Sequence, residues 1–331
     1  MRLSIVTTLY KSAPTLDRFY RRAKAAAEVL TNDYEIVMVD DGSPDNSLAL
    51  ATEISERDHR VRVVELSRNF GHHKALMTGL DHSTGELCFL IDSDLEEDPE
   101  LLAAFFDKLE DSGADVVYGY QEDRKGGIGE RLTGYIAYWL FKLLIAFPVP
   151  RNHITVRLMR REYVDSLLMH KERQTVIGGL WIITGFRQIG VPVAKLSKGT
   201  STYSLWRRWR MLIDSVTSFS EVPLVGIFYL GIIICMLSAV VGFSLLFRKL
   251  FLGQVLAGWT SVMISVWFLG GLLILCVGVV GIYISKIFIE TKNRPYSIVR
   301  KVHQKDAADA ANDRGAHAVT KDTRFQDSRG Q

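Results

Sequence analysis

The run Leu87-Cys88-Phe89-Leu90-Ile91-Asp92-Ser93-Asp94 holds five apolar residues followed by two carboxylates with one serine between them. Such a run is typical of a buried strand whose carboxyl end opens into a site. Alternate side chains of extended backbone point the same way, so Asp92 and Asp94 converge while Ser93 faces elsewhere. Because neighbouring carboxylates repel each other, we expect a divalent cation there, Mg²⁺ or Mn²⁺. The alternative is a solvated turn that caps the helix beginning near Pro99.

Strand and helix patterns alternate over the first 120 residues. We expect strands at residues 3–10, 35–41, 62–66, 86–91 and 115–120, and helices at 13–30, 48–56, 74–82 and 100–111. This alternation predicts βαβ units and an α/β fold with a mostly parallel sheet. No P-loop and no Gly-x-Gly-x-x-Gly motif follows the first strand, which argues against ordinary NTPase and dinucleotide-binding functions.

Length and composition exclude several classes of protein. The 331 residues, 48% of them hydrophobic, suffice for one large or two ordinary domains. The 40 basic and 37 acidic residues nearly balance, so no nucleic-acid partner is expected. Three cysteines without metal-ligand spacing do not predict a disulfide framework, which favours a cytosolic location for the polar part of the chain. The first residues lead directly into a strand pattern, and we expect no signal peptide.

A second pair of acids, Asp40 and Asp41, ends the strand expected at residues 35–41. Carboxylates at the carboxyl end of a strand can accept hydrogen bonds from a nucleobase or from ribose hydroxyls. An Asp-Gly turn followed by a helix cap is the alternative interpretation.

Three motifs occur in order: Val39-Asp40-Asp41-Gly42-Ser43, Ser67-Arg68-Asn69-Phe70-Gly71 and Asp92-Ser93-Asp94-Leu95. Together they resemble the family 2 glycosyltransferases with the GT-A (Rossmann-like) fold. Within that family the chain is similar to the polyprenyl-phosphate group, which includes dolichyl-phosphate mannose synthase and bacterial undecaprenyl-phosphate glucosyl transferases. The resemblance covers about residues 1 to 290.

The resemblance implies roles for the acids of the first stretch. Asp92 would contact the ribose or sugar of a nucleotide sugar, and Asp94 would bind the metal that bridges the donor diphosphate. Glu97 stands at the place of the family's third acid, as a candidate base or metal-side carboxylate. An acid-rich first turn of a helix explains Glu97 equally well.

The remaining donor contacts come from the other two motifs. By the resemblance Asp41 would contact the base, and Asp40 belongs to the same turn. Arg68 and Asn69 lie in a loop before a helix, whose free N–H groups suit phosphate or sugar oxygens. The adjacent residues His72 and His73 are interpreted as cap or surface residues rather than ligands.

Later motifs are predicted to bind the acceptor phosphate. Arg157-Leu158-Met159 resembles the family's Phe-Arg-Leu-Met element, but Thr155-Val156 replaces the acid and aromatic before the arginine, so this chain lacks the family's acid at that place. Lys11-Ser12 likewise replaces the usual Asn-Glu after the first strand. The predicted acceptor contacts are Arg157, Lys195, Lys198, Ser201 and Tyr203.

Two apolar stretches, residues 223–247 and 259–284, are each long enough to cross about 30 Å of hydrocarbon. They predict a transmembrane helical hairpin, with an amphipathic juxtamembrane helix at 204–222. The shorter apolar stretch at 136–147 predicts a helix that is either buried or lies at the membrane interface. Basic residues flank both outer ends of the hairpin. This distribution predicts an inner-membrane, multi-pass protein whose catalytic domain and both termini are cytoplasmic.

The predicted domain order is a cytosolic GT-A catalytic domain at 1–203, the juxtamembrane helix at 204–222, the two membrane helices within 223–289, and a basic segment with a disordered tail at 290–331. Glycines in the second apolar stretch permit close helix contact, which allows a homo-oligomer.

The predicted function is metal-dependent, inverting transfer of a sugar from a nucleotide sugar to a polyprenyl (undecaprenyl) phosphate, for glycan or lipopolysaccharide modification. A processive polysaccharide synthase is an alternative, but the Gln-x-x-Arg-Trp motif of such enzymes lacks its glutamine at residues 205–209. An inactive, membrane-tethered nucleotide-sugar binding scaffold also remains open. A transporter is less favoured, since the two apolar stretches carry no internal ionisable residues.

Overall fold

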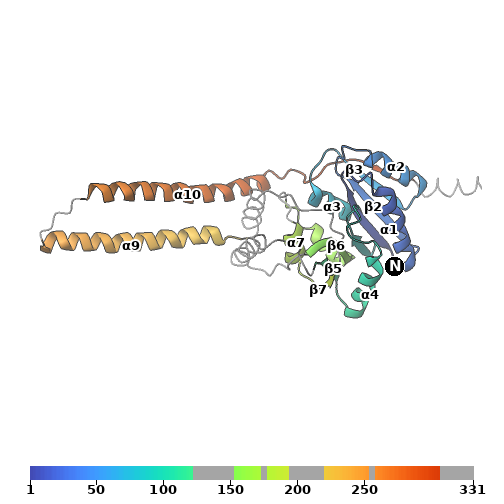
Figure 1. The fold of residues 1–331 in the computed structure, drawn as a ribbon, viewed down its shortest axis with the longest axis horizontal. Helices are drawn as coiled ribbons and strands as arrows, with labels where there is room; N and C mark the ends of the chain where they lie inside the picture. Colours follow the sequence, from blue (N-terminus) through green and yellow to red (C-terminus); the bar gives the residue numbers. More distant parts are fainter. Residues whose placement is uncertain (122–152, 173–176, 194–219, 253–257, 306–331) are drawn as a thin grey trace, which may run out of the picture. The chain divides into compact units, whose positions relative to one another are not determined.

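A computed structural model describes residues 1–121, 153–172, 177–193, 220–252 and 258–305 (Figure 1). The chain divides into two compact units. The first contains Met1–Lys125, Pro150–Ser201 and Pro295–Gln331, and the second contains Gly126–Val149 and Thr202–Arg294. The first unit is therefore built from segments on both sides of the second.

An eight-stranded sheet forms the first unit. Its strands are β1 (Leu3–Leu9), β2 (Tyr34–Asp40), β3 (Val61–Leu66), β4 (Leu87–Leu90), β5 (Val116–Tyr120), β6 (His153–Arg160), β7 (Gln188–Pro192) and β8 (Val299–His303). The order across the sheet is β7-β5-β6-β4-β1-β2-β3-β8. Strands β1 to β4 are mutually parallel, whereas β6 and β8 run antiparallel to their neighbours. The predicted mostly parallel α/β sheet is confirmed.

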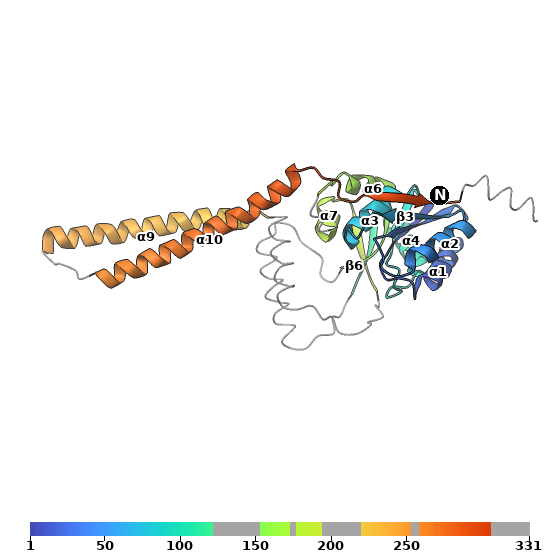
Figure 2. The ribbon, with the colours of Figure 1, turned by 90° about the horizontal axis from the view of Figure 1, so that it is seen from above.

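Helices cover both faces of this sheet (Figures 1 and 2). The described helices of this unit are α1 (Leu16–Leu30), α2 (Ser47–Arg57), α3 (His72–Asp81), α4 (Leu101–Ser112), α6 (Arg161–Leu168) and α7 (Ile177–Ile183). Helices α1, α2 and α4 share a buried core with alternate strand residues. Helix α3 lies on the opposite face, where a Cβ at Gly79 would come within 2.6 Å of Val6 Cγ1. Glycine at that position lets the helix approach β1 closely.

The five predicted strands and four predicted helices are confirmed, with ends within three residues of those expected. Strands β6, β7 and β8 were not predicted. β6 inserts antiparallel between β4 and β5, and β8 pairs antiparallel with β3 at the edge of the sheet. β8 follows the apolar helices in the chain, within the segment for which only a basic stretch and a tail were expected.

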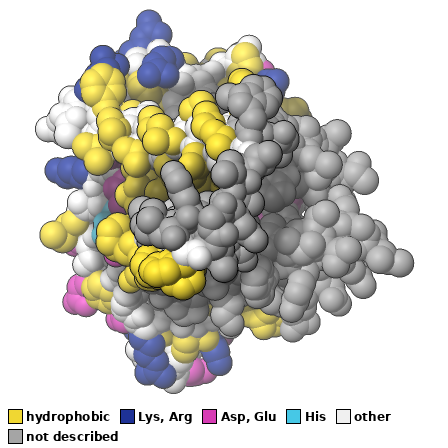
Figure 3. All heavy atoms as spheres, turned by 90° about the vertical axis from the view of Figure 1, so that its left-hand side faces the viewer, with side chains coloured by type: hydrophobic (Ala, Val, Ile, Leu, Met, Phe, Trp, Pro, Cys, Tyr) yellow, Lys and Arg dark blue, Asp and Glu magenta, His cyan; other side chains and the backbone are white. Residues whose placement is uncertain are grey.

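The second unit contains two long helices, α9 (Val222–Leu252) and α10 (Trp259–Thr291). Exposed hydrophobic side chains gather on the surface of this unit (yellow in Figure 3). The hydroxyl of Tyr283 on α10 donates to the carbonyl oxygen of Ser220, just before α9, at 2.7 Å. Within the described residues, Ser265–Thr291 is long and apolar enough to cross a membrane, and Val222–Ser238 is a shorter apolar helical stretch. The predicted hairpin of two spanning helices stays a prediction.

We predict that β8 stabilises the first unit by closing the edge of β3. Replacing Lys301 and Val302 together with proline should lower the midpoint of thermal unfolding by about 2–4 °C, since at least one proline removes an N–H that faces β3. Both side chains are exposed, so the matched Lys301→Ala/Val302→Ala variant keeps the ladder and should unfold near the wild-type temperature. Equal effects of the two variants would contradict this role.

Candidate active site

The candidate site lies at the carboxyl ends of β1, β2 and β4, which are adjacent and parallel. Leu9 pairs with Asp40 and Val6 with Leu90, so the residues that follow these pairs meet at one edge of the sheet, the edge formed by the carboxyl ends of its parallel strands. Thr8, two residues beyond Val6, therefore lies beside Asp92, two residues beyond Leu90. The structure brings both predicted acidic turns to this edge.

Ser93 fixes the acidic turn after β4. Its hydroxyl donates to the carbonyl oxygen of Thr8 at 2.8 Å and lies 2.9 Å from the hydroxyl of Ser12. The hydroxyl of Thr15 donates to the carbonyl oxygen of Ser93 at 2.9 Å. Ser93 is buried, as the alternation predicts, while Asp92 is partly exposed and Asp94 is exposed. Ser12, a departure from the family pattern, is thus a structural partner of this turn.

The backbone beside the site adopts two uncommon conformations. Lys11 after β1 has φ 58° and Leu95 after Asp94 has φ 61°, both in the left-handed region that non-glycine residues rarely occupy. The carboxylate of Asp94 accepts the N–H of Glu96 at 2.9 Å. Leu95 is buried, so its packing holds the turn in this shape.

Asp94 and Asp92 offer the hard oxygen donors that Mg²⁺ or Mn²⁺ prefers. Within the described ranges, no group of three or more His, Cys, Asp or Glu side chains is placed to hold a metal ion. Mg²⁺ is commonly bound by one or two carboxylates together with substrate phosphates, and the residues present fit that kind of site.

Asp40 and Asp41 are both buried, at 2% and 3% exposure. Asp41 accepts the N–H groups of Phe70 and Gly71 at 2.7 and 3.0 Å, so it holds the loop that precedes α3. Burial raises the pKa of Asp41, and these two hydrogen bonds oppose the rise. Burial also raises the pKa of Asp40, and the charge of Glu65 on β3 adds to it.

Arg68 and Asn69 lie in the loop held by Asp41, and both are exposed. The guanidinium of Arg68 stacks 4.1 Å from the centre of the Phe70 ring. A Cβ at Gly42, whose φ is 63°, would come within 2.6 Å of the Asn69 nitrogen. Only glycine permits this contact. The contact brings together the two loops whose residues are predicted to bind the nucleotide sugar.

Glu97 is 1% exposed and lies in the segment between Asp94 and α4. The structure thus places it in the protein interior, in the same turn region as the metal candidate. Its predicted roles, base or metal-side carboxylate, stay a prediction.

From the sequence, His72 is interpreted as a cap or surface residue, and its side chain is 46% exposed, but the structure also places it against the site. It is the first residue of α3, and its Nε2 lies 3.5 Å from Oδ1 of Asp92, while its Nδ1 lies 3.1 Å from the hydroxyl of Thr8. Partial burial lowers the pKa of His72, and this shift favours the neutral ring. The negative charges of Asp41 and Asp94 oppose the shift. No local pattern reveals these contacts, since Thr8 and Asp92 are distant in the sequence.

Arg157 lies on β6 opposite Leu90, on the strand that neighbours β4. Its side chain is 2% exposed, donates to the carbonyl oxygens of Thr155 and Ile154, and stacks 3.0 Å from the centre of the Trp181 ring. Burial lowers its pKa to about 9. The described side chain is therefore enclosed beside the site rather than open to a ligand. The other predicted acceptor contacts, Lys195, Lys198, Ser201 and Tyr203, lie outside the described residues, as does most of the predicted 204–222 helix.

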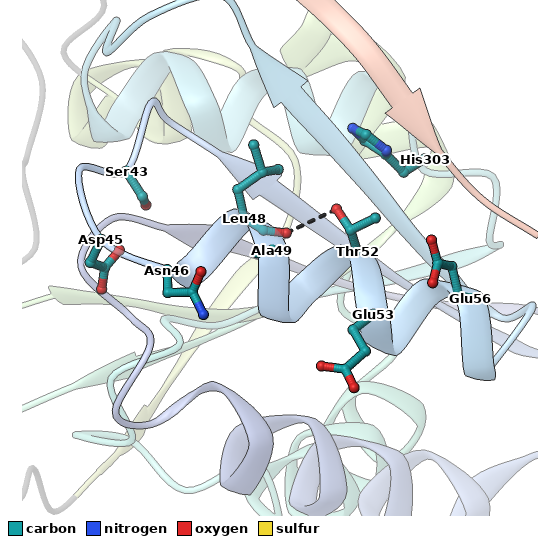
Figure 4. A pocket seen from close by; sticks show the side chains of 9 residues that line it. All are labelled: Ser43, Asp45, Asn46, Leu48, Ala49, Thr52, Glu53, Glu56 and His303. Atoms are coloured by element: carbon teal, nitrogen blue, oxygen red, sulfur yellow. Dashed lines mark hydrogen bonds between the residues drawn. The ribbon is translucent and has the colours of Figure 1, made fainter.

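A separate pocket of about 500 Å³ lies along α2 (Figure 4). It is lined by Ser43, Asp45, Asn46, Leu48, Ala49, Thr52, Glu53, Glu56 and His303. None of the predicted site residues lines it. Its three acids would repel a diphosphate, so it does not serve as the donor site.

The fold and this edge define an α/β enzyme domain whose acidic site lies at the carboxyl ends of parallel strands, a GT-A-like architecture. Residues 4–168 match the family model "Glycosyl transferase family 2". A protein of Mycobacterium tuberculosis (strain CDC 1551 / Oshkosh) that is named among glycosyltransferases is 53% identical over 306 residues, which are 92% of this chain and 90% of its own length.

Two more relatives extend this similarity. The uncharacterized glycosyltransferase YkcC of Bacillus subtilis (strain 168) is 32% identical over 91% of this chain and 94% of its own. The SfII prophage-derived bactoprenol glucosyl transferase of Shigella flexneri is 31% identical over 92% of this chain and 99% of its own. The chain belongs to glycosyltransferase family 2 and is a glycosyltransferase.

We predict that Asp40 lowers the stability of the protein at neutral pH. Because its pKa is raised in the folded state, the ionised carboxylate costs stability once the pH rises through that value. Asp40→Asn should raise the midpoint of thermal unfolding at pH 7 by about 2–4 °C. The gain should shrink as the pH falls toward about 4 and should vanish below that value, where the carboxyl is protonated in both states.

Asp58 is the matched control with the opposite sign. It is buried and accepts hydrogen bonds from Tyr20, Lys24 and Arg60, which hold its pKa below the usual range despite burial. Asp58→Asn should therefore lower the unfolding midpoint at pH 7, with a loss that shrinks toward acid pH. The same sign for both variants would refute the assignment of the Asp40 shift to burial.

Proposed function

We propose that the protein transfers a sugar from a nucleotide-sugar donor to a polyprenyl phosphate at the cytoplasmic face of the membrane. The observation that carries this proposal is the meeting of Asp41, Asp92 and the turn bearing Asp94 at one edge of the sheet. The name of the Shigella relative, bactoprenol glucosyl transferase, supports the polyprenyl acceptor, since the two chains align over almost their whole lengths.

The apolar helix α10 supports action at a membrane. An 18-residue window of its stretch Ser265–Thr291 has a mean hydropathy of 2.5, and none of that window is buried. A polyprenyl chain stays in the bilayer, so an enzyme anchored there meets its acceptor phosphate at the surface. We propose that α9 and α10 both span the membrane, with α9 as the first span, and that the basic residues at the outer ends of this pair lie in the cytoplasm.

The donor lies across the edge formed by β1, β2 and β4. Asp41, together with Asp40, binds the base of the nucleotide, and Asp92 binds the ribose or the sugar. Arg68 and Asn69 contact phosphate or sugar oxygens. These residues act by orienting the donor, which is the main contribution of a protein to a transfer of this kind. Lys195, Lys198, Ser201 and Tyr203 are proposed for the acceptor phosphate, whereas the enclosed Arg157 is not proposed to contact it directly.

A phosphate oxygen of the acceptor attacks the anomeric carbon on the side opposite the nucleoside diphosphate. The new C–O bond forms as the bond to the diphosphate oxygen breaks, and the configuration inverts. A phosphate monoester is largely ionised near neutral pH, so no strong protein base is required, although Glu97 remains a candidate. A Mg²⁺ or Mn²⁺ ion held by Asp94 would stabilise the charge of the leaving diphosphate.

The test uses the full chain, undecaprenyl phosphate, Mg²⁺ or Mn²⁺, and labelled UDP-, GDP- and dTDP-sugars, with label measured in the organic-extractable lipid. We expect one donor to give a lipid product that requires the metal. Asp94→Ala should reduce transfer on the order of 100-fold. Asp111→Ala, at an exposed acid near the end of α4, should not.

Each other outcome has a definite meaning. Label in a growing polymer would identify a processive synthase instead. Donor binding without transfer would support the scaffold interpretation, and near-normal transfer by Asp94→Ala at saturating metal would overturn the metal role of Asp94.

A further inference from the structure

We propose that His72 is a positioning residue that holds the carboxylate of Asp92 in place by bridging it to Thr8 of β1. The inference rests on the proposed function, in which Asp92 contacts the donor. It adds a residue that the sequence motifs leave unassigned.

The bridge uses both nitrogens of one imidazole. Nδ1 of His72 lies 3.1 Å from Oγ1 of Thr8, and Nε2 lies 3.5 Å from Oδ1 of Asp92. In the neutral tautomer with hydrogen on Nε2, the ring accepts from the Thr8 hydroxyl and points its N–H toward the carboxylate. Few other side chains can accept at one end and donate at the other across this span.

The start of α3 is itself fixed above this edge. Asp41 accepts the N–H groups of Phe70 and Gly71, the two residues immediately before His72. Thr8 is fixed through its carbonyl oxygen, which accepts the hydroxyl of Ser93. The backbone that carries His72 and its partner Thr8 are therefore both held by elements that build the site, so the ring has a fixed position from which to orient Asp92.

The side chain of His72 is 46% exposed, and yet its ring contacts both β1 and the turn after β4. A residue that only begins a helix needs no contact with β1 or with the turn after β4. His72 makes both contacts, and they connect the β1 end to the carboxylate proposed to orient the donor.

The first test is kinetic, with the full chain, undecaprenyl phosphate as acceptor and the nucleotide sugar from the UDP-, GDP- and dTDP-sugar panel that the wild type uses. His72→Ala should raise KM for the nucleotide sugar about 10-fold and leave KM for undecaprenyl phosphate within about twofold. His72→Gln, whose amide can reach Asp92, should recover most of the loss. His59 lies just before β3, at the amino ends of the parallel strands, away from the site. His59→Ala is the matched control, and both of its KM values should equal those of the wild type.

The second test examines the bridge without any substrate. Thermal unfolding midpoints of Thr8→Val, His72→Ala and the double variant should be non-additive, because either single change already breaks the contact. Additive shifts would overturn the proposal even if no donor in the panel reacts, which separates its failure from failure of the proposed function. A His72→Ala variant with unchanged donor KM, or one that His72→Gln does not rescue, would also overturn it.

Discussion

The hydrogen bonds of Ser93 connect the chemistry of this protein to its fold. They tie the turn that carries Asp92 and Asp94 to the backbone of β1 and to the hydroxyl of Ser12. Two carboxylates on a free loop would separate to reduce their repulsion. Here the serine between them anchors the turn to a buried strand, so both acids stay at the edge where the other strands also end.

Negative charge is concentrated at this edge at a cost in stability. Asp40 and Asp41 are buried, and Glu65 lies beside Asp40. Asp92 and Asp94 follow β4, which is separated from β2 by β1. The protein offsets part of that cost locally: backbone N–H groups bind Asp41, and Arg300 and His303 of β8 lie 3.2 and 3.0 Å from Glu65. Negative charge that is only partly compensated in this way is characteristic of a site that binds a cation or accepts hydrogen bonds from a ligand.

The parts predicted from the sequence are those with local signals. Apolar runs ending in acids marked β2 and β4, and helical periodicity marked α1 to α4. β6 and β8 carried no comparable signal, because an antiparallel strand that inserts into a parallel sheet is selected by its neighbours rather than by its own pattern. His72 was missed for a related reason, since its partner Thr8 is 64 residues away and only the folded sheet brings the two together.

The place of β8 also orders events during synthesis. The ribosome synthesises β3 early, but its antiparallel partner Val299–His303 is synthesised only after both apolar helices. Until then the hydrogen-bonding groups along that side of β3 are open, an exposure that invites wrong pairing with other chains. The catalytic sheet therefore gains its last strand only at the end of synthesis, so the fold of the enzyme is completed after its apolar helices have been made.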